Sequence, residues 1–257
     1  MSGVGSTEPP KSEGTGFAGA EAGVSLYDSI ARIYDPWSLS VTEDIDFYVE
    51  LARANTGPVV ELAVGTGRIA LPIAQAGVQV IGVDQSEGML AVARERAREL
   101  GVESRVDLRV GDLRAPPITE RVHLVICPFR SLLHMQDESE KLQALRAAHS
   151  ILEPGGRLAF DVFAPGREDI DETHGRWLER EPGIFERADW DEAARTLTLT
   201  VRSGESTATM ALHWLGAAEW LVLIDRAGFE VEATYGWFDG RPYAGEEDMI
   251  FVCRRVD

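Results

Sequence analysis

The stretch VVELAVGTGRIALPIAQAGVQVIGVD, residues 59–84, decides the fold of this 257-residue chain. An apolar run leads into Gly65 and Gly67, a helical pattern follows, and a second apolar run ends in Asp84. Glycines let the backbone approach a ligand closely, and the start of the following helix favours negative charge. A carboxylate at the end of the next strand can hold two ribose hydroxyls. The stretch therefore predicts a nucleoside-binding crevice at the ends of two parallel strands.

Outward from this unit, strand and helix patterns keep alternating. Three apolar runs predict further strands, RVDLRV, HLVICPF and GRLAFDVF, and two amphipathic runs predict helices, SEGMLAVARERARELG, opened by Ser86, and ESEKLQALRAAHSILE. Upstream, SLYDSIARIYDPW and TEDIDFYVELARAN show helical spacing, with Thr42 as a cap for the second. Strands alternating with helices indicate an α/β protein with a doubly wound, mostly parallel sheet of Rossmann type.

The pattern changes after Phe163. Four short runs, GRWLERE, GIFERADWD, RTLTLTVRS and TATMALHW, alternate with period two and have no helix between them, which predicts an antiparallel insertion. Before them, the acidic run REDIDETH, residues 167–174, predicts a solvated loop. The final runs FEVEATYGW and MIFVCRR lack a crossover helix, so the last strand is expected to be antiparallel.

These patterns divide the chain into four parts. We expect a disordered tail over 1–23, a cofactor-binding core over 24–163, an insertion covering the active site over 164–216, and the rest of the core over 217–257. The start of the chain lacks the layout of a secretory signal, and no apolar run could span a membrane, so a cytoplasmic protein without membrane contact is expected. A net charge of −18 argues against nucleic acid as a partner.

The glycine motif does not by itself identify the cofactor. Gly65-Thr66-Gly67-Arg68-Ile69-Ala70 also fits the dinucleotide fingerprint of an NAD(P)-dependent oxidoreductase, and a non-catalytic cofactor-binding interaction module is a further alternative. The five histidines are scattered and the two cysteines, Cys127 and Cys253, lie in apolar runs, so no metal site is predicted.

Several separate segments resemble the S-adenosylmethionine-dependent methyltransferases of class I. ELAVGTGR, VDQSEGML, GDLR, LEPGGRLAFDVF and DMIFVCRR are similar to the motifs of that family, and the resemblance extends over residues 25–257. It implies a seven-stranded sheet, S-adenosylmethionine as methyl donor and S-adenosylhomocysteine as product. It also implies cofactor contacts at Glu61, Ala63, Gly65, Gly67, Arg68, Asp84, Gln85, Met89, Asp112, Leu113 and Cys127. Ala63 departs from the family pattern, which has glycine there and so carries one methyl group less beside the cofactor.

Within that family, the chain is similar to the small-molecule enzymes that dimethylate amino sugars. LYDSIARIYD and Ser131-Leu132-Leu133-His134 carry this similarity, which places Tyr27, Tyr34 and His134 around the methyl-transfer site. His134 would then act as general base, since imidazole accepts a proton near neutral pH. The two tyrosines could equally form one core stripe of a helix, and His134 could be a packing residue. The expected activity is N- or O-methylation of a small molecule, and a homodimer is left open.

Overall fold

The computed structural model describes residues 42–257. The expected tail and the first expected helix, which contains Tyr27 and Tyr34, lie outside the described residues. The core elements in chain order are α2 (Glu43–Arg53), β1 (Val59–Leu62), α3 (Ala70–Gln75), β2 (Val80–Asp84), α4 (Glu87–Glu99), η1 (Glu103–Arg105), β3 (Val106–Val110), β4 (Val122–Cys127), η2 (Ser131–His134), α5 (Glu138–Ile151), β5 (Leu152–Phe163), α7 (Ala217–Arg226), β10 (Phe229–Tyr235) and β11 (Asp248–Arg255).

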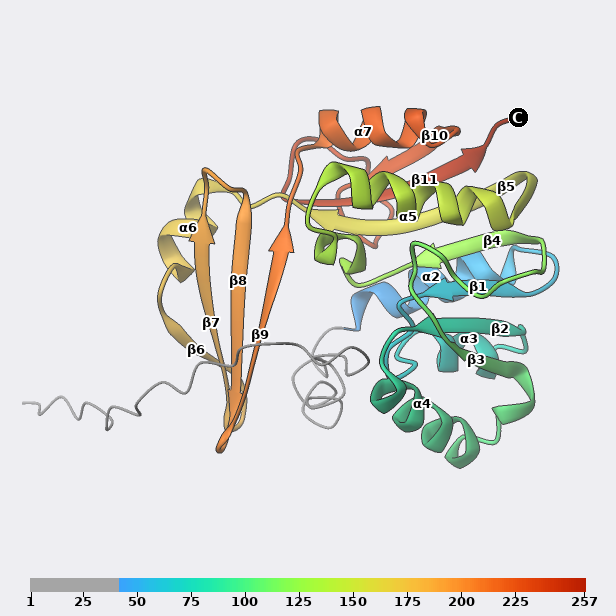
Figure 1. The fold of residues 1–257 in the computed structure, drawn as a ribbon, viewed down its shortest axis with the longest axis horizontal. Coiled ribbons are helices and arrows are strands. Elements are labelled where there is room, and N and C mark those ends of the chain that lie inside the picture. The colour runs from blue at the N-terminus through green and yellow to red at the C-terminus, as the bar shows by residue number, and fades with distance from the viewer. Residues whose placement is uncertain (1–41) are drawn as a thin grey trace, which may run out of the picture.

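The core is a seven-stranded sheet with the order β10-β11-β5-β4-β1-β2-β3 (Figure 1). β11 runs antiparallel to both of its neighbours, β5 and β10, whereas β1, β2, β3, β4 and β5 pair in parallel. The predicted doubly wound α/β sheet with an antiparallel last strand is therefore confirmed. Because connections without a helix cannot join parallel neighbours, the short link from β10 to β11 explains the reversal.

Apolar side chains on both faces of the sheet explain why its strands are apolar throughout. All four residues of β1 are buried, since α2 and α3 pack on one face and α5 and α7 on the other. Val60 belongs to the cluster with α5, and its neighbour Val59 belongs to the cluster with α2. A sheet covered in this way exposes its polar chemistry only where its strands end.

The helix starts bear out one of the two predicted caps. The Ser86 hydroxyl accepts a hydrogen bond from the Met89 amide at 3.1 Å and so caps α4. Thr42 precedes α2, but its side chain makes no capping hydrogen bond; instead the Thr42 amide donates to the Glu43 carboxylate at 2.9 Å. The prediction for Thr42 was wrong in its chemistry, because the contact that forms uses the Thr42 amide and not its hydroxyl.

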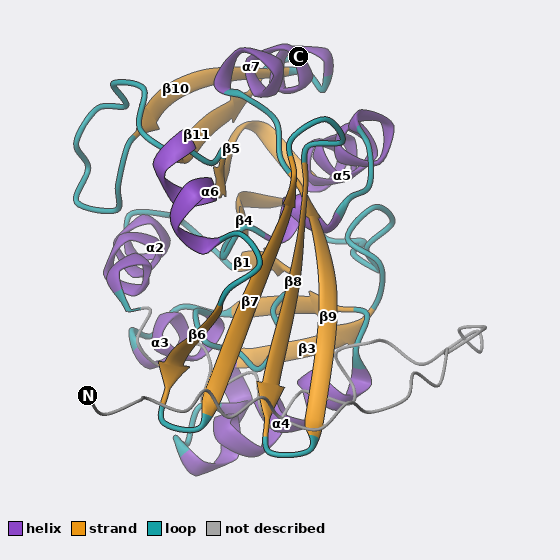
Figure 2. Cartoon of the chain, turned by 90° about the vertical axis from the view of Figure 1, so that its left-hand side faces the viewer, coloured by secondary structure: helices purple, strands orange, loops and turns teal. Residues whose placement is uncertain are grey.

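The insertion is a four-stranded antiparallel sheet in the order β6-β7-β8-β9 (Figure 2). Its strands are β6 (Trp177–Glu181), β7 (Ile184–Asp191), β8 (Thr196–Ser203) and β9 (Ser206–His213). The predicted antiparallel insertion is thus confirmed, and Figure 2 shows it in front of the carboxyl ends of the core strands. Burial alternates along β8, so that Leu197, Leu199 and Val201 form one apolar face.

A short helix corrects the prediction for residues 167–174. The acidic run forms α6 (Arg167–Thr173) and not a solvated loop. The Gly166 amide donates to the Asp169 carboxylate at the helix start, Ile170 is buried, and the Thr173 hydroxyl accepts a hydrogen bond from the Trp190 indole at 2.8 Å. With only one buried apolar residue, α6 offers no helical periodicity to read, because tertiary contacts with β7 hold it in place.

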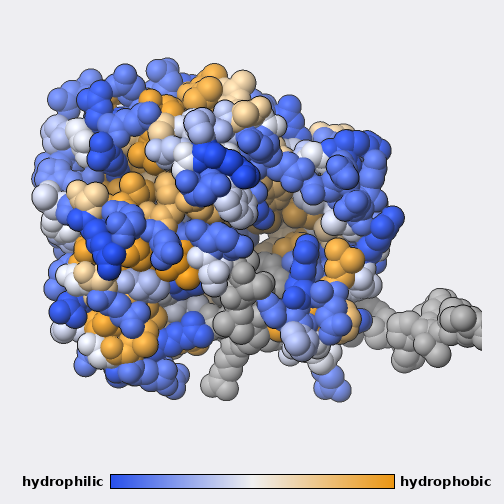
Figure 3. All heavy atoms as spheres, turned by 180° about the vertical axis from the view of Figure 1, so that it is seen from behind, coloured by the Kyte–Doolittle hydropathy of each residue, from blue (hydrophilic) through white to orange (hydrophobic). Residues whose placement is uncertain are grey.

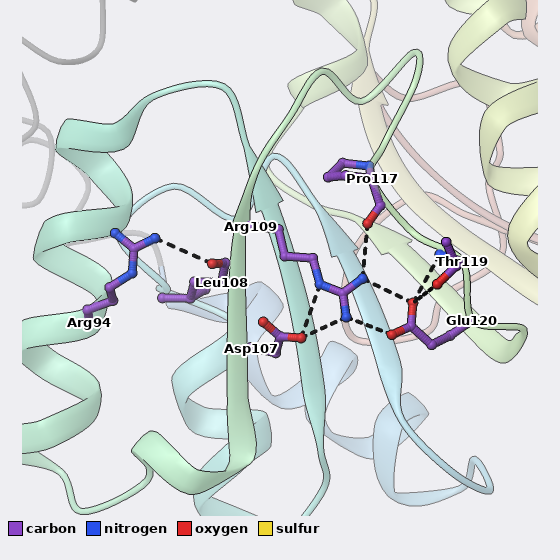
Figure 4. Close-up of polar contacts among 7 residues, drawn as sticks. All are labelled: Arg94, Asp107, Leu108, Arg109, Pro117, Thr119 and Glu120. Atoms are coloured by element: carbon purple, nitrogen blue, oxygen red, sulfur yellow. Dashed lines mark hydrogen bonds and ion pairs between the residues drawn. The ribbon is translucent and has the colours of Figure 1, made fainter.

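Charged side chains cover the outer strand of the core sheet. The Arg109 guanidinium on β3 donates to the Asp107 and Glu120 carboxylates at 2.7 Å and to the Pro117 carbonyl at 3.0 Å (Figure 4). In the same view, Arg94 on α4 reaches the Leu108 carbonyl. These contacts tie β3 to the loop that leads into β4, where the structure describes no crossover helix.

Candidate functional site

One cavity of about 640 Å³ lies between the core and the insertion. Seen from behind, hydrophilic and hydrophobic side chains are interspersed over the surface of the core (Figure 3). The cavity is lined on one side by the carboxyl ends of the parallel strands and on the other by the inner face of the four-stranded sheet. In open parallel sheets ligands bind at these strand ends, so this cavity is the candidate active site.

The nucleoside side of the cavity is built around Asp84. Its carboxylate accepts hydrogen bonds from the Gly65 amide at 2.9 Å and from the Ser86 amide at 2.8 Å. Two backbone donors thus orient the carboxylate between the turn after β1 and the start of α4. Seven of the expected cofactor residues line the cavity: Ala63, Gly65, Asp84, Gln85, Met89, Asp112 and Leu113.

The turn after β1 needs a left-handed backbone at three positions. Gly65 and Gly67 have φ angles of 56° and 84°, and Ala63 has a φ of 58°. For a residue with a Cβ this conformation costs roughly 1–2 kcal/mol. The departure at Ala63 therefore concerns backbone strain in the free protein as well as the extra methyl group expected from the sequence.

Four expected cofactor residues lie behind the cavity wall. Gly67 and Cys127 are buried, and Arg68 forms a two-bond ion pair with Asp44 at 2.7 and 2.5 Å while its guanidinium lies over the Phe129 ring. Glu61 is 2% exposed, and within residues 42–257 its Oε2 has no hydrogen-bond partner. Burial raises the pKa of Glu61 well above its ordinary value. A buried oxygen without a partner requires a ligand group or a water molecule.

Asp112 is held differently from Asp84. The Arg114 guanidinium donates to both of its carboxylate oxygens, the Arg114 amide donates to one of them, and Arg114 also pairs with Glu140 on α5. Hydrogen bonds from Arg114 lower the pKa of Asp112. The carboxylate is consequently ionised at neutral pH and lines the cavity two residues beyond the end of β3.

The opposite side of the cavity belongs to the insertion and to η2. The apolar residues Leu197, Leu199, Met210 and Leu212 line it from β8 and β9. The ion pair between Arg180 and Glu186, at 2.9 Å, interrupts this apolar face. The loop after β4 adds Phe129 and Arg130 to the lining, and η2 adds Ser131 and His134. An apolar surface with few charged groups suits an organic molecule with an apolar body.

His134 lines the cavity as expected, but its surroundings were not foreseen. Burial lowers its pKa to about 4, and the positive charge of Lys141 together with His213 adds to the effect. Lys141 on α5 is itself buried, donates to the Met135 carbonyl, and has its pKa lowered to about 8. Lys141 and His213 lie 7 and 79 residues from His134 in the chain. Neither position carries a recognisable motif, so only the packing of α5 and β9 against η2 reveals them.

The comparisons with known proteins agree with this geometry. Residues 59–156 match the family model of a methyltransferase domain. The cypemycin N-terminal methyltransferase of a Streptomyces species is 26% identical over 91% of this chain and 96% of its own. The structure of the CcbJ methyltransferase from Streptomyces caelestis superposes with a TM-score of 0.81, at 26% identity, over 92% of this chain and 100% of that one. The matching methyltransferase domain and these relatives together support a class I S-adenosylmethionine-dependent methyltransferase.

A third match concerns the fold of this methyltransferase. The structure of CalS10, an amino pentose methyltransferase from Micromonospora echinaspora, superposes with a TM-score of 0.63 at 20% identity and covers 93% of this chain and 100% of that one. The matches do not favour the oxidoreductase or the non-catalytic module considered from the sequence. Methyl transfer from S-adenosylmethionine is the activity of this enzyme.

The residues present fit this cofactor. S-adenosylmethionine carries a ribose diol, an adenine, and an ammonium and a sulfonium that are both cationic. The oriented carboxylate of Asp84 and the ionised Asp112 supply acceptors and negative charge on the side of the cavity that the turn after β1 forms. No helix within residues 42–257 has the length and apolar character to cross a membrane.

Proposed function

We propose that this enzyme N-methylates a small organic amine that carries an apolar body. The observation that carries the proposal is the division of one cavity into two unlike sides, with oriented carboxylates toward the core and the apolar inner face of the insertion opposite them. The similarity to an N-terminal methyltransferase supports nitrogen as the acceptor atom, and O-methylation of a small molecule is the second candidate.

On the core side, we assign cofactor binding to residues of the turn after β1 and of the ends of β2 and β3. Asp84 would hold the ribose hydroxyls, Asp112 and Leu113 the adenine, and Gly65 lets the backbone approach the amino-acid end. Gln85 and Met89 complete this side, and Glu61, Gly67, Arg68 and Cys127 support it from behind. When bound, the cofactor supplies a methyl group on a good leaving group, so alignment of the two reactants and exclusion of water are what the protein must add.

On the acceptor side, His134 would accept a hydrogen bond from the amine. Its pKa of about 4 keeps the imidazole neutral at physiological pH, which suits acceptance but makes it a weaker base than an ordinary histidine. We therefore assign it orientation of the nitrogen lone pair first, and receipt of the proton second. Tyr27 and Tyr34 stay proposals for the same site, on the family resemblance alone.

The cysteines and the net charge bear on the location of the protein and on its partners. Cys127 and Cys253 are buried free thiols, which suits the reducing cytoplasm, and the net charge of −18 opposes nucleic acid as a partner. We propose a cytoplasmic enzyme whose partner is its small-molecule acceptor.

The test is transfer of label from methyl-labelled S-adenosylmethionine to a panel of primary and secondary amines, matched with phenols and alcohols of the same apolar body. We expect labelled amines. Labelled phenols alone would move the proposal to oxygen, whereas tight binding of S-adenosylhomocysteine without turnover on any compound would contradict it.

The role of His134 is tested in the same assay. His134→Ala should lower kcat/KM for the amine by about 10- to 100-fold, the value of one lost hydrogen bond in the transition state. Affinity for S-adenosylhomocysteine should stay within about twofold, because the assigned cofactor contacts lie on the core side. A variant with unchanged turnover would return His134 to a packing role.

A further inference from the structure

Asp161, near the end of β5, is a buried carboxylate that accepts three hydrogen bonds from other parts of the chain. It is 5% exposed and lines the cavity. Its Oδ1 accepts from the Tyr48 hydroxyl at 2.7 Å and from the Phe129 amide at 2.8 Å, and its Oδ2 accepts from the Arg130 amide at 2.9 Å. The three donors lie 113, 32 and 31 residues away in the chain. One side chain thus joins α2, the loop after β4, and β5.

The two amide donors come from an unusual piece of backbone. Phe129 and Arg130 are consecutive, carry side chains, and both have left-handed φ angles, of 58° and 59°. Successive amides in special conformations of this kind can form a concave site for an anionic oxygen. Here the anion is supplied by the protein, and the strained pair persists because the Asp161 carboxylate satisfies both amides.

The same backbone leads directly to the acceptor side of the cavity. The Ser131 hydroxyl donates to the Pro128 carbonyl at 2.7 Å, and the Leu133 amide donates to the Arg130 carbonyl at 2.9 Å, which starts η2. His134 ends η2 one helical turn later. Arg130 also pairs with Asp248 and lies over the Phe163 ring, so the loop is held from both sides.

We propose that Asp161 is a positioning residue for methyl transfer: its carboxylate holds Phe129 and Arg130 in the left-handed backbone that places Phe129 and His134 against the acceptor. The proposal rests on the proposed function, since it assigns those two side chains to the acceptor. It differs from a purely structural role because the backbone that Asp161 holds leads directly into the acceptor side of the cavity, through Phe129, Arg130 and η2.

Protonation offers a readout that a structural role would not move. Asp161 is faced by Tyr48 and Asp44 from α2, by Cys127 from β4 and by Arg130 from the loop. Burial raises its pKa to about 6, against the lowering effect of Tyr48 and Arg130. Below that pH the carboxyl group becomes a donor as well and accepts the two amides less well. Turnover should therefore fall as the pH drops through about 6, while affinity for S-adenosylhomocysteine stays level.

The experiment compares Asp161→Asn with two controls. The amide has a single acceptor oxygen and places an N–H group against one of the backbone donors, so it cannot satisfy both. Tyr48→Phe removes one bond but leaves both amides in place, and Asp225→Asn makes the same chemical change at an exposed site on α7. Methyl transfer by the wild-type enzyme is measured first, so that failure of the proposed function is seen before any variant is made.

We expect Asp161→Asn to lower kcat by at least about 20-fold, with S-adenosylhomocysteine affinity within about twofold and no acid limb near pH 6 in its residual activity. Tyr48→Phe should lose less than about fivefold and keep the limb, and Asp225→Asn should match the wild type. Turnover within twofold of wild type, or a variant that keeps the acid limb, would overturn the proposal. If Asp161→Asn does not fold, the wild-type profile decides: an acid limb without loss of cofactor affinity supports the proposal, and its absence refutes it.

Discussion

The two sheets of this enzyme meet at one cavity but present different kinds of groups to it. The core sheet is buried on both faces, so it contributes backbone turns and carboxylates from its strand ends, such as Asp84. The four-stranded sheet has one face toward the cavity, so it contributes alternate side chains such as Leu199 and Met210. An inward side chain of the four-stranded sheet can change without moving a backbone hydrogen bond. A strand-end carboxylate such as Asp84, by contrast, accepts hydrogen bonds that hold its turn in place.

This contrast predicts that acceptor recognition and cofactor recognition can be damaged separately. In a variant that damages one side, the other side serves as an internal control.

Leu199→Asp should damage the acceptor side alone. Leu199 is 6% exposed on the inner face of β8, and a carboxylate there would have to stay hydrated next to an apolar acceptor. We expect kcat/KM for the amine to fall about 30- to 1000-fold, which corresponds to a loss of roughly 2–4 kcal/mol in transition-state stabilisation. Leu199→Met, of similar volume, is the matched control. Equal losses of acceptor turnover and of S-adenosylhomocysteine affinity would show that the two sides are not separable.

Asp84→Ala should damage the cofactor side. The change removes the expected partner of the ribose hydroxyls and also releases the Gly65 and Ser86 amides. Calorimetry with S-adenosylhomocysteine should show affinity weaker by about 1–3 kcal/mol. Asp225→Asn on α7 controls for the loss of one negative charge. Unchanged affinity would remove Asp84 from the cofactor site.

The pH dependence of stability should report the burial of His134. Because its pKa is about 4 in the folded protein and near 6.5 when unfolded, the unfolded chain binds the proton more readily. Stability from this group is therefore present above pH 6.5 and is lost as the pH falls toward 4. Between pH 8 and 5.5, urea unfolding of the wild type should lose roughly 1–2 kcal/mol more than unfolding of His134→Gln. Asp161 acts in the opposite direction but is common to both proteins. Parallel pH curves would mean that His134 is exposed to solvent.

Ala63→Gly should have the smallest effect and should sharpen the account of the turn after β1. Glycine relieves the left-handed strain at a φ of 58° but costs entropy in the unfolded chain, so we expect a gain of about 0.5–1 kcal/mol in the free energy of unfolding. Thermal unfolding measures it, with Ala76→Gly after α3, where the backbone is right-handed, as the opposite control. A loss of stability at Ala63 would contradict the strain assigned to this position.

The sequence predicted the parts of the enzyme that depend on neighbours in the chain. Period-two and helical patterns located the strands of both sheets, and the spacing from Gly65 to Asp84 located the turn and the carboxylate that the structure joins by a hydrogen bond. The resemblance to a family added the number of strands in the core sheet, seven. These signals are either local patterns or motifs shared by many proteins, and both can be recognised in a single sequence.

The rest depends on contacts between distant segments. Asp161 reads as an ordinary polar residue at a strand end, and only the fold brings the Tyr48 hydroxyl and two strained amides to it. Lys141 reads as one position of an amphipathic helix, although it is buried beside His134. No sequence motif indicates the contacts around His134, because they arise when η2 packs against α5 and β9.

The ion-pair network around Arg109 has a consequence for how copies of this protein meet one another. β3 is the outermost strand of the core sheet, and an open edge can recruit a strand from another chain. Here the edge strand is five residues long, and its Arg109 side chain donates both to Asp107 in the same strand and to Glu120 in the loop that follows. A strand from another chain would lie against these charges and could form only a few backbone hydrogen bonds with so short an edge strand. We therefore expect this edge to resist edge-to-edge aggregation even in concentrated solution.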